Sequence, residues 1–151
     1  MPFLVSREGD VRLLTELLGG GPPEDWQLGL YNAAVTPAET DTAATYASHE
    51  ASFASYARKT LTRTVSATTW NAPVLQPPSG APAWSPRGQV AHAKYGDAPL
   101  SWTVGETGDV IHGYFIVGAT SGMLILAEQF ASPRTLQPGD TLSITPVFEV
   151  A

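Results

Sequence analysis

The sequence has 151 residues, of which 43% are hydrophobic and 15% are charged, and its formal net charge is −6. This length is typical of one domain with a core of its own, and the absence of cysteine excludes disulfides and zinc–thiolate sites. The eight lysines and arginines are scattered, which argues against binding to nucleic acid or to an anionic membrane, because both depend on clustered cations.

The start of the chain, MPFLVSREGD, lacks the charged and long apolar regions of a signal peptide, and no apolar run approaches the length of a membrane span. We therefore expect a soluble protein. Residues 1–21 are predicted to be an N-terminal segment with one short helix, followed by a single β domain over residues 22–151.

The helix is predicted within DVRLLTELLGGG, with Asp10 as the candidate N-cap and Gly19–Gly21 as the stop. Its apolar residues are spaced at i, i+3, i+6 and i+7, so they share one helical face: Val11, Leu14, Leu17 and Leu18. A helix of three turns is marginal alone, so this face is expected to pack on something. Packing on its own domain is the commoner outcome, and docking on a neighbouring subunit would make these four residues an assembly interface.

From Trp26 the hydrophobic period becomes two residues, which predicts a strand in WQLGLY. The Ala-, Ser- and Thr-rich residues 36–61 favour loop with short pieces of strand. TRTVSATTW, residues 62–70, predicts another strand, and the Pro- and Gly-rich residues 71–88 predict a long surface loop. Trp84 in that loop is the candidate exposed aromatic.

Residues 110–130, VIHGYFIVGATSGMLILAEQF, predict a hairpin of two buried strands with its turn at Gly118–Gly122. The final stretch, LQPGDTLSITPVFEV, alternates apolar and polar residues after a turn at Pro138–Asp140, and Pro146 places this strand at an edge. Seven to nine short strands and one helix predict a mainly β fold, an antiparallel β-sandwich or jelly roll.

Three residues of the predicted hairpin belong to types that catalytic sites use: His112, Ser121 and Glu128. Ser121 lies in GATSG, which lacks the G-x-S-x-G elbow, and a cross-strand contact of His112 with Glu128 is more often structural than catalytic. The histidines His49, His92 and His112 are isolated, and no H-x-H or H-E-x-x-H spacing occurs. We predict no catalytic residue, no metal ligand and no cofactor.

A wider set of motifs occurs in order along the chain: LLTELLGG, LGLYNAAVTPAETDTAATY, HEASFASYARKTL, HGYFIVGATSGMLILAEQF and LQPGDTLSITP. Together they resemble a family of small structural proteins of tailed bacteriophages, over roughly residues 10–150. The sequence departs from the family pattern in residues 72–88. The matching positions are Leu28, Leu30, Tyr31, Asn32, Glu50, Ala51, Phe53, Tyr56, Gly113, Tyr114, Phe115, Ala127, Glu128, Phe130, Gly139, Asp140, Ile144, Thr145 and Pro146.

The resemblance implies a virion component without enzymatic activity, most simply a capsid decoration protein that binds the head. Its expected partners are further copies of itself, with a trimer as the first expectation, and the major capsid protein. A tail or neck protein of the same virion is the first alternative. A carbohydrate-binding β-sandwich using exposed tryptophans and a metal-dependent enzyme using His92 and His112 are the others.

Overall fold

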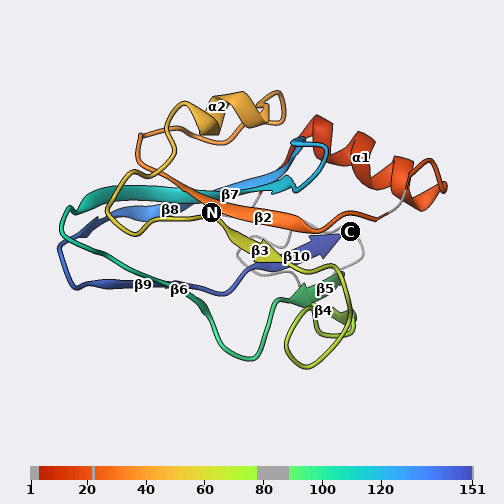
Figure 1. The fold of residues 1–151 in the computed structure, drawn as a ribbon. Helices are drawn as coiled ribbons and strands as arrows, with labels where there is room; N and C mark the ends of the chain where they lie inside the picture. The colour runs from red at the N-terminus through yellow and green to blue at the C-terminus, as the bar shows by residue number, and fades with distance from the viewer. Residues whose placement is uncertain (1–3, 22, 78–88, 151) are drawn as a thin grey trace.

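The computed structural model describes residues 4–21, 23–77 and 89–150, and Trp84 lies outside this range. The chain forms two layers of antiparallel β-structure (Figure 1). One layer is a five-stranded sheet in the order β1-β8-β7-β2-β3. Its strands are β1 (Leu4–Val5), β2 (Trp26–Tyr31), β3 (Lys59–Leu61), β7 (Asp109–Gly118) and β8 (Leu124–Leu136).

The second layer consists of two smaller sheets that pack below the first in the view of Figure 1. A three-stranded sheet has the order β10-β5-β4, and β6 pairs with β9 in a two-stranded sheet. The strands are β4 (Val74–Gln76), β5 (Val90–Lys94), β6 (Leu100–Thr103), β9 (Thr141–Ile144) and β10 (Val147–Val150). The predicted mainly β, antiparallel fold with a short N-terminal helix is confirmed, and the layers are arranged like a sandwich.

The main core lies between the two layers. Side chains of β2 such as Leu28 and Leu30 meet Trp70, Tyr95 and Trp102 from the opposite layer. A second cluster covers the other face of the large sheet, where Tyr46 of the short helix α2 (Ala43–Ala47) stacks on Phe115 with ring centroids 5.5 Å apart. Because the large sheet is covered on both faces, its central strands are long apolar runs rather than alternating ones.

The predicted hairpin is present as β7 and β8, with the turn between Gly118 and Leu124. Two expectations for segments before this hairpin were wrong. Residues 62–70 form turns and isolated bridges, because the pairing with β2 ends at Leu61. Residues 43–47 form α2, whose start at Thr42 is closed by a capping box with Thr45.

The last strand of the sequence is two strands in two different sheets. The backbone breaks at Thr145 and Pro146, and the Pro146 carbonyl accepts a hydrogen bond from the Tyr95 N–H at 2.9 Å. The inside–outside alternation reverses at this break, so Glu149 is buried and Val150 is exposed. The predicted single alternation to Val150 was therefore wrong, since proline cannot continue the ladder, although β10 does lie at the edge of its sheet.

The N-terminal helix α1 spans Arg7–Leu17 and lies beside the turn that joins β7 to β8 (Figure 1). Its N-cap is Ser6 and not Asp10. The Ser6 hydroxyl accepts from the Gly9 N–H at 3.0 Å and donates to the Leu124 carbonyl at 2.5 Å. One side chain thus caps the helix and fixes it to β8, a partner that the local sequence does not reveal.

Candidate assembly surface

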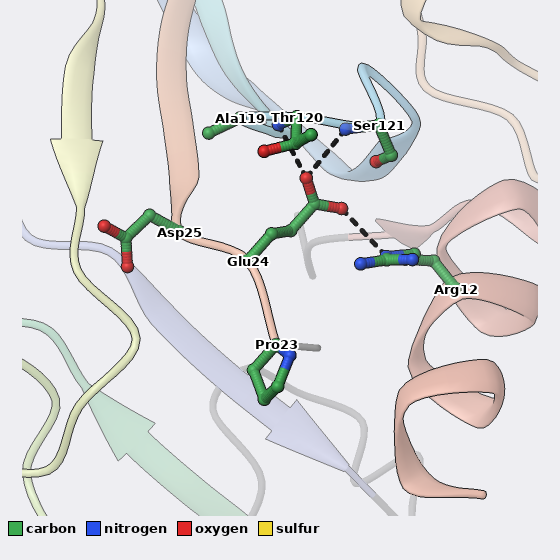
Figure 2. A pocket seen from close by; sticks show the side chains of 7 residues that line it. All are labelled: Arg12, Pro23, Glu24, Asp25, Ala119, Thr120 and Ser121. Carbon is green, nitrogen blue, oxygen red and sulfur yellow. Dashed lines mark hydrogen bonds and ion pairs between the residues drawn. The ribbon is translucent and has the colours of Figure 1, made fainter. Parts of the chain in front are cut away.

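The helix α1 turns its small and charged residues toward the sheet. Gly9 is buried directly against the backbone of Ile125, where any Cβ would overlap the carbonyl group. Glu8 accepts a hydrogen bond from the Leu124 N–H at 3.0 Å. The close approach that Gly9 allows brings the next turn of the helix, with Arg12, within reach of the residues that precede β2 (Figure 2).

Glu24 is the anchor on the body of the protein. Its carboxylate is buried and accepts hydrogen bonds from the backbone N–H groups of Thr120 at 2.6 Å and Ser121 at 2.7 Å. Its other oxygen forms an ion pair with Arg12 (Figure 2), and the distance to Nε of Arg12 is 2.8 Å. Burial raises the pKa of Glu24, but the hydrogen bonds from Ser121 and Thr120 and the charge of Arg12 outweigh it, so the net pKa lies below its usual value.

Two more charges extend this network along the helix. Glu16 lies 3.1 Å from Nε of Arg12 and also pairs with Arg63. The Arg63 guanidinium stacks over the Trp26 ring at 4.7 Å from its centroid. The charges of α1 are thereby neutralised on the side that faces the protein, where water is largely excluded and each contact is stronger than it would be on the surface.

The opposite side of α1 is apolar and exposed. The exposed fractions are 60% for Val11, 55% for Leu14, 82% for Leu17 and 76% for Leu18. We call these four residues the stripe. A surface helix of a globular protein usually faces its core with the apolar side and solvent with the polar side. Here the orientation is reversed, so the four candidate interface residues do not pack on their own domain.

A shallow groove lies next to the stripe, between α1 and the three-stranded sheet. Leu13 lies beside the stripe on the helix, lines the groove and packs against the main core. The groove is lined mainly by apolar side chains: Leu13, Trp26, Val65, Trp70, Pro73 and Phe148. Val65 is 65% exposed at its rim, whereas Trp26 and Trp70 are buried beneath it, with their rings 5.8 Å apart.

Two of the three residues considered for catalysis, Glu128 and Ser121, have structural partners. Glu128 accepts a hydrogen bond at 2.5 Å from the Tyr114 hydroxyl, directly opposite it on β7. His112 lies at a register shift of β7, and the backbone of Ser121 binds Glu24. Within the described part of the chain, no hydrogen bond joins His112, Ser121 and Glu128 to one another, so they do not form a triad.

The histidines do not gather either. His92 pairs across β5 and β10 with the buried Glu149, at 3.1 Å between Nδ1 and Oε1, while His49 is exposed in a loop. Over residues 4–21, 23–77 and 89–150 no group of three histidines, aspartates or glutamates is placed to hold a metal ion. Trp84, the candidate exposed aromatic, is outside the described residues.

Several residues that carry the family resemblance hold the fold together. Tyr56 donates to Glu50 at 2.7 Å and accepts from the Leu30 N–H at 3.0 Å. Arg58 forms a two-pronged ion pair with the same Glu50, with both distances 2.7 Å. The hydrogen bonds and the charge of Arg58 keep the pKa of Glu50 below its usual value, although burial, the largest single influence, acts the other way.

The network of Glu24, Arg12, Glu16 and Arg63 was not predicted from the sequence. The spacing of Arg12 and Glu16 at i, i+4 was the only local signal for it. Glu24 stands in GGGPPED, which looks like an ordinary charged linker, and the two backbone N–H groups that bind it lie 96 and 97 residues away.

Comparison with known proteins gave no match among protein-family models, curated proteins or solved structures. None of the helices in the described part of the chain combines the length and the apolar character that crossing a bilayer requires. The features of this protein that bear on its function are therefore the surface described above and the sequence motifs.

Proposed function

We propose that this protein is a structural component of a tailed-phage virion that acts by assembly and not by catalysis. It belongs to the capsid surface, as a decoration protein that binds the head together with further copies of itself, with a trimer as the first expectation. The ordered motifs from LGLY to GDTLSITP support the phage assignment. The stripe on α1 supports the assembly mechanism.

The observation that carries this proposal is the reversed amphipathicity of α1. Four large apolar side chains stand in water on a helix that turns Arg12 and Glu16 inward, into ion pairs with Glu24 and Arg63. An exposed apolar patch of this kind is typical of a protein–protein contact. Standard interfaces bury about 800 Å² per partner, and the stripe is a suitable centre for one.

A tail or neck position in the same virion is the alternative that the stripe serves equally well. A carbohydrate-binding role has less support, because the described tryptophans are committed to the fold. Trp26, Trp70 and Trp102 are at most 8% exposed, and Trp102 donates its indole N–H to the Ala57 carbonyl at 2.8 Å.

The test is binding to assembled heads. The gene is expressed with the major capsid gene of the phage that encodes it, and particles are sedimented through a density gradient. We expect the wild-type chain to sediment with the particles and the double variant Leu14→Asp, Leu17→Asp to stay at the top. Leu75→Asp is the matched control, because Leu75 is 70% exposed on β4 and belongs to neither the stripe nor the groove.

Circular dichroism of the soluble variants shows whether the fold persists. Absence of the wild-type chain from both purified heads and purified tails would refute the proposal. Recovery with tails alone would move the protein to the alternative position.

A further inference from the structure

The stripe and the groove are complementary in shape and in chemistry. The stripe is a convex ridge of branched aliphatic side chains, and the groove is a concave strip lined mainly by apolar side chains, including two tryptophans. Among the residues that the structure describes, no acidic side chain lines the groove. The one cation among these lining residues, Arg63, is already paired with Glu16 and stacked on Trp26. Both surfaces are therefore apolar, and the stripe is convex where the groove is concave.

The two surfaces cannot satisfy each other within one chain. The groove begins at Leu13, on the side of α1 next to the stripe, so the stripe faces away from the groove of its own copy. The helix is also held in place, by the Ser6 cap, the ion pair of Arg12 with Glu24 and the contact of Gly9 with β8. A rotation that buried the stripe would bring those charges into water and break each of these contacts.

We propose that the stripe of one copy packs into the groove of a second copy. This inference rests on the assembly role proposed above and names the partner of the stripe. The exposed fractions of the four side chains leave roughly 500 Å² of apolar surface, a large share of the ~800 Å² that one partner buries in a standard interface. The rim of the groove, with Val65 at 65% exposure, adds to it.

The adjacency of the two surfaces limits the geometry of the assembly. Each copy presents both halves of the contact, so every copy in a closed ring can use its stripe and its groove at once. A contact between unlike surfaces closes into rings such as a trimer, and a pair of copies can also make it twice about a two-fold axis. The net charge of −6 on each chain opposes association at long range, so added salt is expected to strengthen it.

The experiment uses two kinds of variant, one defective in the stripe and the other defective in the groove. Leu14→Asp with Leu17→Asp removes the stripe, and Val65→Asp charges the rim of the groove, with Pro73→Asp as a second groove variant. All four positions are half or more exposed or lie at the surface, so the variants are expected to keep the wild-type circular dichroism spectrum. Leu75→Asp is again the control.

The mass of each protein in solution is measured by sedimentation equilibrium at concentrations of tens of micromolar. We expect an oligomer for the wild type and for Leu75→Asp, and monomers for the stripe variant and for both groove variants. A one-to-one mixture of stripe and groove variants is expected to form a heterodimer, because the intact stripe of one finds the intact groove of the other.

Three results would overturn the inference: a monomeric wild type, groove variants that associate as the wild type does, or a mixture that stays monomeric. The second would indicate that stripes pack against stripes, and the third that the stripe of one copy does not bind the groove of another. A monomeric wild type that still binds phage heads through the stripe would overturn this inference alone and leave the proposed function intact. If the wild type is an oligomer and the mixture of variants associates, but the protein binds no part of the virion, the proposed function is overturned and this inference stands.

Discussion

Replacement of Glu24 by glutamine tests whether the buried ion network holds α1 in its reversed orientation. The carboxylate accepts two backbone hydrogen bonds, from Thr120 and Ser121, and pairs with Arg12. Hydrogen bonds to a charged group contribute about 1.5–3 kcal/mol each, against about 0.5–1.5 kcal/mol for neutral ones. The amide keeps the shape and an accepting oxygen, so the two bonds weaken by about 2 kcal/mol together.

Loss of the Arg12 pair adds about 1 kcal/mol, which is moderate because Arg12 keeps Glu16 as a second partner. We therefore expect Glu24→Gln to lower the free energy of unfolding by about 3 kcal/mol at neutral pH. The measurement is urea denaturation followed by tryptophan fluorescence. Glu106→Gln is the matched control, because Glu106 is exposed, and its effect is expected to stay within about 0.5 kcal/mol.

The pH dependence of the difference gives a second, independent check. The pKa of Glu24 is lower in the folded chain than in the unfolded chain. Its contribution to stability is therefore fully present above the unfolded pKa and is lost as the pH falls toward the folded pKa. The difference between wild type and Glu24→Gln should shrink over that interval. A difference that is negligible at neutral pH, or that is unchanged by acid, would refute the reasoning.

Three further substitutions test the fold. Gly29→Ala should lower the free energy of unfolding by about 2 kcal/mol in urea, because a Cβ there meets the ring of Phe115, which is fully buried and has nowhere to go. Ser6→Ala should cost about 1–2 kcal/mol and raise hydrogen exchange in the first turn of α1, since cap and anchor are lost together; equal exchange in both proteins would contradict it. Tyr114→Phe should cost about 1–3 kcal/mol by thermal or urea unfolding, because it removes the 2.5 Å bond to Glu128, and an unchanged stability would show that water replaces the hydroxyl.

The resemblance and the fold are consistent at particular residues, although neither establishes the phage role. Motif residues such as Tyr31, Tyr56 and Phe115 are core or partly buried aromatics, and Glu50 and Glu128 are their hydrogen-bonding partners or neighbours. The motifs therefore describe how the sheet is held together. They do not describe a reactive pocket, and the prediction that the protein is not an enzyme stays a prediction.

Local sequence patterns predicted those elements whose apolar residues form an uninterrupted run or a regular spacing along the chain. The change to a two-residue period at Trp26 predicted β2, and the apolar runs around Gly118–Gly122 predicted the hairpin of β7 and β8. They failed where a distant contact decides the structure. The alternation up to Val150 predicts one strand, yet the chain changes partners at Pro146: β9 before it pairs with β6, and β10 after it pairs with β5.

The sequence by itself determined that a helix near residues 10–18 has one apolar face. The spacing of Val11, Leu14, Leu17 and Leu18 puts all four on the same side of a helix. Only the tertiary structure decided which way that face points. The decision depends on Glu24 and Arg63, which attract the charged face of α1, and on Gly9, which lets that face approach the sheet. Hydrophobic periodicity shows which residues share a face of a helix. Whether that face points toward the core or toward solvent depends on partners that folding brings from elsewhere in the chain.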